Sequence, residues 1–168
     1  MVGEQMNFLN GYSRLVRGVD QWALNLAAAM LLAIVCVNAL SIFFRYVVEA
    51  PLSWSEEAMR YGNIWVTYLG AIAAQVRSDH MRLELPYASH PTMGQVLRLF
   101  GAAAAIVLAL FLVWLGTRGA LAALGQRSPS ARIPMSLPYA AVPLAGIGIL
   151  LAAGYSFLCA LRRVEEVR

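Results

Sequence analysis

The sequence contains no lysine, and it has only two cysteines and two histidines among its 168 residues. Cys36 and Cys159 lie inside long apolar runs, where a thiol behaves as a small apolar side chain. His80 and His90 are ten residues apart and supply fewer ligands than a metal site needs. We therefore expect no disulfide framework, no metal centre and no other bound cofactor.

Catalytic motifs are missing as well, because the chain has no HExxH, GxSxG, Walker A or paired CxxC sequence. The segments outside the apolar runs, such as the 21-residue N-terminal tail, are far shorter than the ~50 residues of a small catalytic domain. No acidic residue lies in the middle of an apolar run, and no inverted repeat is visible. The arginines are scattered, which argues against nucleic acid. We expect neither an enzyme nor a stand-alone transporter, but a partner of a transporter.

Long apolar segments dominate the rest of the chain, since 60% of its residues are hydrophobic and its mean hydropathy is +0.64. Four of them are each long enough to cross the ~30 Å hydrocarbon core of a bilayer at ~1.5 Å per residue. We place transmembrane helices at 22–44, 54–76, 95–119 and 137–161. The predicted fold is all-α and integral to the membrane, a single four-helix domain over residues 1–168 with short connections along the surface.

Residues 1–21 predict an amphipathic helix that lies at the membrane interface before the first crossing. Its apolar side chains recur at spacings of about three and four: Phe8, Leu9, Tyr12, Leu15, Val16 and Val19. With the N-terminus cytoplasmic, eight of the thirteen arginines fall on the cytoplasmic side, so we expect both termini there. Interfacial anchoring is expected from Arg14, Arg17, Arg77, His80, Arg82, Arg98 and Arg118.

The connection between the first two predicted helices is rich in charged residues. A capping-box pattern from Ser53 to Glu56 predicts that the second helix starts near Ser53, and Glu56 and Arg60 have the spacing of an i,i+4 ion pair. Because charge is costly against lipid, we expect protein to cover one face of this helix; alternatively, its charged side chains lie in the headgroups. The candidate partner-subunit interface comprises Arg45, Trp54, Glu56, Glu57, Arg60 and Asn63.

Residues 125–134 predict a loop, with Pro129 among its breakers, and the following helix has a plausible cap in Ser136. The fourth helix carries Gly148 and Ala152 at the spacing of a small-xxx-small motif. Small residues at this spacing let two helices approach closely inside a membrane. We therefore expect this face of the fourth helix to contact another helix.

Several motifs together resemble the DctQ-like family, the small membrane subunit of tripartite ATP-independent periplasmic (TRAP) transporters. Each motif is short, and their order and spacing are more specific than any one of them. The resemblance extends over about residues 22–161. The motifs are Arg45-Tyr46, Pro51-Leu52-Ser53-Trp54-Ser55-Glu56-Glu57, Leu69-Gly70-Ala71, His80-Met81-Arg82-Leu83, Ile133-Pro134-Met135, Pro138-Tyr139 and Pro143-Leu144.

This resemblance implies a four-helix subunit of the bacterial inner membrane that contacts phospholipids and two proteins. A large DctM-like permease subunit would carry the substrate and sodium ions, and a periplasmic DctP-like binding protein would deliver an organic acid, often a carboxylate. The small subunit would be neither an enzyme nor a cofactor carrier, but a brace for the large subunit's scaffold during elevator motion. An independent small oligomeric transporter or channel, with Asn38, Asn63 and Thr67 lining a path, is the alternative.

Overall fold

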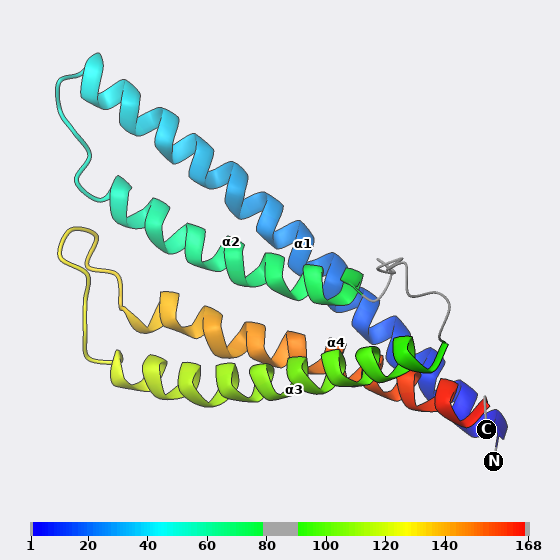
Figure 1. Cartoon of the computed structure of the whole chain (residues 1–168). Coiled ribbons are helices and arrows are strands. Elements are labelled where there is room, and N and C mark those ends of the chain that lie inside the picture. The colour runs from blue at the N-terminus through cyan, green and yellow to red at the C-terminus, as the bar shows by residue number, and fades with distance from the viewer. Residues whose placement is uncertain (1, 79–90, 167–168) are drawn as a thin grey trace.

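The computed structural model of the chain describes residues 2–78 and 91–166, and the regular elements in these ranges are four helices (Figure 1). They are α1 (Val2–Tyr46), α2 (Ser55–Ser78), α3 (Pro91–Ala122) and α4 (Ser136–Glu166). The predicted all-α fold is therefore confirmed. α3 starts at Pro91, earlier than the predicted residue 95, because proline is well suited to the first turn of a helix.

Three segments are long and apolar enough to cross a membrane: Gly11–Tyr46, Leu99–Ala122 and Ser136–Leu161. They correspond to the first, third and fourth predicted crossings. α2 is not among the candidate spans found in the described residues; besides the charged residues of its first turns it carries Asn63, Thr67 and Gln75 further along. Length and composition therefore support three of the four predicted crossings.

The helices form two hairpins that pack side by side in the order α1, α2, α4, α3 (Figure 1). α2 lies between α1 and α4, while α4 lies between α2 and α3. The α1–α2 hairpin is antiparallel, with Ile34 against Gly62 at its middle and Ser41 against Ser55 near its turn. This order makes α2 and α4 the inner helices, and it leaves α1 and α3 at the two edges.

Glycine lets α4 approach both of its neighbours closely. A Cβ atom at Gly146 would lie 2.9 Å from the backbone nitrogen of Val113 on α3, and one at Gly148 would lie 2.8 Å from Cδ1 of Ile72 on α2. Ala152, one turn after Gly148, is only 2% exposed. The predicted small-residue contact face is therefore confirmed, and it serves packing within this chain.

α1 is one continuous helix of 45 residues, which corresponds to a length of ~67 Å. The helix has no break at the predicted boundary after residue 21, and the buried face that includes Val16 and Ala23 continues across it. The Tyr12 hydroxyl donates a 2.7 Å hydrogen bond to the backbone carbonyl of Leu151 on α4. Tyr12, Val16 and Val19 of the predicted interfacial face thus pack against α2 and α4, whereas Leu15 is 52% exposed. The side chains of Phe8 and Leu9 lie outside the described residues.

Candidate functional site

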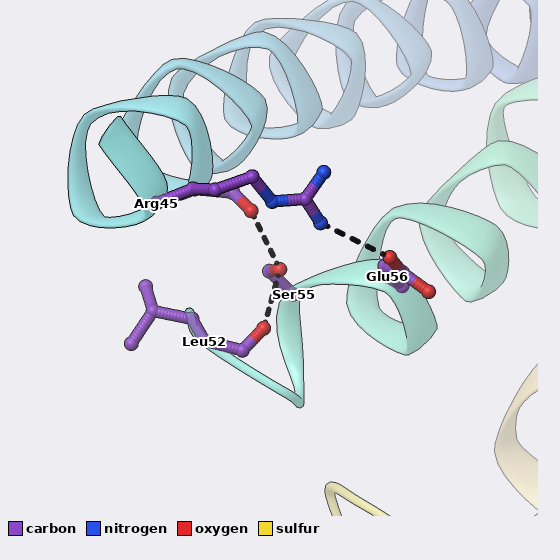
Figure 2. Close-up of polar contacts among 5 residues, drawn as sticks. Arg45, Leu52, Ser55 and Glu56 are labelled. Carbon is purple, nitrogen blue, oxygen red and sulfur yellow. Dashed lines mark hydrogen bonds and ion pairs between the residues drawn. The ribbon is translucent and has the colours of Figure 1, made fainter. Parts of the chain in front are cut away.

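The turn between α1 and α2 is held by two buried hydroxyl groups (Figure 2). The Ser55 hydroxyl donates to the backbone carbonyl of Leu52 at 2.7 Å, so the 2.9 Å contact between the two serine hydroxyls has Ser41 as its donor. The helix was predicted to start near Ser53; that residue lies in the turn, and α2 begins two residues later at Ser55. The serine that fixes this turn is therefore Ser55, the second of the two in the motif.

Arg45 and Glu56 form an ion pair across this turn, with 3.5 Å between Nη2 and Oε1 (Figure 2). The two side chains are 54% and 67% exposed, so the pair contributes only ~0–1 kcal/mol. The predicted pair between Glu56 and Arg60 is not among the ion pairs of the described residues and is therefore wrong. The end of α1 lies near enough for Arg45 to replace Arg60 as the partner.

Glu57 points to the other hairpin and accepts three hydrogen bonds from the loop between α3 and α4. The donors are the Ser128 hydroxyl at 2.6 Å, the Ala131 amide at 2.9 Å and the Ser130 amide at 3.2 Å. This loop lies between two of the apolar spans, so Glu57 is at the end of the helix layer and outside the apolar spans. One carboxylate therefore ties the two hairpins together at this end.

Hydrogen bonding lowers the pKa of the Glu57 carboxyl. The Ser128 hydroxyl has the largest effect, followed by the Ala131 amide. Desolvation opposes this shift, while the Ser130 amide and the positive charge of Arg60 add to it. The three donors stabilise the ionised form, as expected for a carboxylate that accepts backbone and hydroxyl hydrogen bonds.

The loop that receives Glu57 has a structure of its own. The Ser128 amide donates to the carbonyl of Ile133 at 2.9 Å, and the Met135 amide donates to the carbonyl of Gln126 at 2.9 Å. Arg132 completes the turn with a φ of 51°, in the left-handed region. This narrow turn directs the amides of residues 130 and 131 at the carboxylate, as in the backbone nests that bind anions.

The remaining candidate interface residues lie on the outside of the protein. Trp54 is 39% exposed in the turn before α2. Arg60 and Asn63 are exposed on the same side of α2 as Glu56, at spacings of four and three residues. The structure therefore separates the predicted set: Glu57 is used within the chain, whereas the exposed members remain available to a partner.

The predicted anchoring residues of α1 and α2 lie near the end of the layer opposite to Glu57. Arg14 is exposed, and Arg17 donates to the Ser13 hydroxyl at 3.0 Å. Arg77, at the end of α2, has its Nε atom 3.6 Å from Oδ1 of Asp20. Asp20 is largely buried, with 16% of its side chain exposed, so this ion pair also fixes α2 against α1.

The other predicted anchors are placed only in part. Arg118 on α3 lies over the ring of Trp114, with 5.5 Å between the guanidinium carbon and the ring centroid, a cation–π arrangement. His80 and Arg82 lie outside the described residues, and the side chain of Arg98 does as well. Among the described residues, no group of three or more His, Cys, Asp or Glu side chains could hold a metal ion.

The fold and these contacts define a class of protein: an integral membrane protein whose polar side chains join helix to helix and helix to loop. The family described as "Tripartite ATP-independent periplasmic transporters, DctQ component" matches residues 31–163, and the chain belongs to this family. A curated protein of Haemophilus influenzae named as a TRAP transporter small permease protein is 27% identical over 127 residues. The match covers 74% of this chain and 79% of that protein. This chain is thus a small membrane subunit of a TRAP transporter.

Sequence reasoning missed the contact between Glu57 and the loop at residues 128–131. The two partners are separated by 71 residues, and nothing in either segment alone indicates that they meet. The available signal was a short loop with two serines around Pro129, because such loops expose amide and hydroxyl donors. Such free donors predict that a hydrogen-bond acceptor binds the loop, but they do not show which acidic residue of the chain is that acceptor.

Proposed function

We propose that this subunit is the scaffold of a sodium-coupled importer for organic acids, with carboxylates as the principal class. It braces the large, elevator-type permease subunit while the transport domain of that subunit moves. The observation that carries the proposal is that the two hairpins are joined at both ends. Glu57 binds the loop at one end, and Tyr12 and Val16 pack against α4 at the other. A layer fixed in this way resists shear, as a stationary frame must.

The proposed topology has four crossings, both termini in the cytoplasm and a location in the bacterial inner membrane. α2 contacts the middle of two neighbouring spans, through Gly62 against Ile34 and through Ile72 against Gly148. A helix in contact with both at these levels lies at membrane depth despite its polar residues. Eight of the thirteen arginines lie on the side of the membrane that holds both termini in this topology, which supports a cytoplasmic location of the termini.

The proposed partners are the large DctM-like permease subunit, a DctP-like periplasmic binding protein and membrane phospholipids. The exposed Arg45, Trp54 and Glu56 at the α1–α2 corner belong to the proposed interface with the large subunit. The exposed arginines at the opposite end, Arg14 and Arg17, would contact lipid headgroups. Sodium ions would bind in the large subunit, and this chain would work without a cofactor.

The test is co-expression of this chain with its cognate large permease subunit, purification in mild detergent and uptake measurements in proteoliposomes. We expect a stable one-to-one complex, and we expect uptake of an organic acid in a sodium gradient only when both subunits and the binding protein are present. Full uptake by the large subunit without this chain would refute the scaffold role. Flux through this chain alone would instead support the oligomeric channel lined by Asn38, Asn63 and Thr67.

A further inference from the structure

α2 carries a straight row of polar side chains on its exposed side, which we call the polar stripe. Its members follow one another at spacings of four, three and four residues, so they lie on one face of the helix. Each of them is exposed in the structure. The polar stripe consists of Glu56, Arg60, Asn63 and Thr67.

The register of α1 and α2 shows how deep this stripe lies. Ser41 meets Ser55, and Ile34 meets Gly62, so the same number of residues separates the two contacts along each helix. Continued in this register, Asn63 lies level with Ala33, near the middle of the apolar run of α1. The part of the polar stripe that contains Asn63 is therefore at the depth of the hydrocarbon core.

The polar groups of the stripe differ in how far their hydrogen-bonding capacity is used. Glu56 is paired with Arg45, and the Thr67 hydroxyl donates to the backbone carbonyl of Asn63 at 2.8 Å. Within the described ranges, the Arg60 guanidinium and the Asn63 side-chain amide have no hydrogen bond or ion pair with another residue. Arg60 acts on Glu57 only through its charge.

We infer that the polar stripe is the seat of one transmembrane helix of the large permease subunit, which places a carboxylate against Arg60 and an amide or hydroxyl against Asn63. A helix fits because only a segment with internally satisfied backbone groups is stable at this depth. A carboxylate fits because the two acids near Arg60 are already engaged, Glu56 by Arg45 and Glu57 by the loop. This inference rests on the proposed function, since it takes the large subunit as the partner.

Two other occupants fit the polar stripe less well. A lipid phosphate stays in the headgroup region, so it cannot reach Asn63 near the middle of the apolar run. In a dimer of this chain, both copies have the same orientation in the membrane, and the symmetry axis is parallel to the membrane normal. That arrangement would place Arg60 opposite Arg60 of the other copy, where like charges repel.

Site-specific crosslinking tests the location directly. In a Cys36→Ser, Cys159→Ser background, single cysteines are introduced by Thr67→Cys on the stripe, where the hydroxyl is hydrogen-bonded within α2, or by Ile147→Cys on the exposed apolar face of α4. Ile147 is 48% exposed and serves as the matched control. After labelling with benzophenone maleimide and illumination in membranes, we expect an adduct with the co-expressed large subunit from position 67 and not from position 147. The reverse result, or no adduct from either position in an intact complex, overturns the inference.

Substitution tests the chemistry of the stripe. We expect Arg60→Ala or Asn63→Leu to reduce co-purification of the large subunit by at least about tenfold, since each leaves a partner group unpaired inside the interface. Arg60→Lys should retain part of the binding, and Arg118→Ala, which removes an exposed arginine from α3, should leave it unchanged. Thermal unfolding of each isolated variant shows whether the chain itself is intact.

The outcomes separate the two proposals. A wild-type complex that is unaffected by Arg60→Ala and Asn63→Leu overturns the polar stripe as the interface and leaves the scaffold role standing. Equal binding by Arg60→Glu and the wild type overturns the carboxylate partner. If the wild-type chain forms no complex with the large subunit, the proposed function fails and this inference fails with it.

Discussion

A methyl group at position 146 has no room between α3 and α4. In a Gly146→Ala variant the new Cβ would lie 2.8 Å from Cγ2 of Val113, 2.9 Å from its backbone nitrogen and 3.1 Å from the carbonyl oxygen of Ala109. Two of these three atoms belong to the backbone of α3, so no side-chain rotation can relieve the overlap. The helices must move apart, and the Gly116 contact with Pro143 in the same hairpin would loosen with them.

The magnitude follows from two opposing effects. Overpacking of a well-packed site costs about 1–3 kcal/mol, whereas replacing glycine by alanine in a helix gains about 1 kcal/mol. Gly70 on α2 is the matched control, because a Cβ there would have no atom within 4 Å. We therefore expect Gly70→Ala to be neutral or stabilising, and Gly146→Ala to be about 1–3 kcal/mol less stable than Gly70→Ala. That difference corresponds to roughly 5- to 150-fold in the unfolding equilibrium.

The assay is equilibrium unfolding of the purified chain in mild detergent by titration with sodium dodecyl sulfate, followed by the fluorescence of its four tryptophans. The two alanine variants are compared with the wild type at matched protein and detergent concentrations. If Gly146→Ala is as stable as Gly70→Ala, the close approach of α3 and α4 is not a constraint on the fold, and the packing argument is refuted.

Three further predictions concern polar contacts. The pKa of the Glu57 carboxyl is lower in the folded state than its ordinary value of 4.5, so its contribution to stability is complete above pH 4.5 and is lost as the pH falls through the lowered pKa. Glu57→Gln should therefore remove this acid dependence of stability and speed amide exchange at Ser130, and unchanged exchange would contradict this. Arg45→Ala should lower the free energy of unfolding by only ~0–1 kcal/mol in the detergent titration, because its ion pair with Glu56 is exposed to solvent. A larger loss would contradict this exposed arrangement. Tyr12→Phe should cost about 0.5–1.5 kcal/mol by losing its hydrogen bond to Leu151, and an unchanged midpoint would argue against that contact.

Local sequence was sufficient where a signal is contained in one segment. The apolar runs give three of the spans, and the spacing of Gly148 and Ala152 gives a real contact face. Local sequence was not sufficient where two neighbouring serines could each mark the start of a helix. Ser53 matches a capping box, yet α2 starts at Ser55, because the hydroxyl of Ser55 is the one that reaches both the turn and α1.

The predicted interface residues show the same limit. Spacing along one helix indicated that Glu56 pairs with Arg60, but the end of α1 brings Arg45 to Glu56 instead. Glu57, next in the chain, faces the opposite hairpin, so adjacent acids have unrelated partners. A one-dimensional pattern cannot assign such partners, because the nearest charge in space comes from another element.

The sequence by itself determined that this protein is helical, that it resides in the membrane and that it belongs to a family of transporter subunits, because hydropathy and motif order are properties of the chain. Tertiary structure alone decided that α1 continues unbroken through residue 21, that Glu57 ties the two hairpins together, and that Arg60 and Asn63 are left exposed beside the apolar spans. The physical reason is that each of these outcomes depends on which surfaces meet, and the helix order α1, α2, α4, α3 brings together residues more than 70 positions apart.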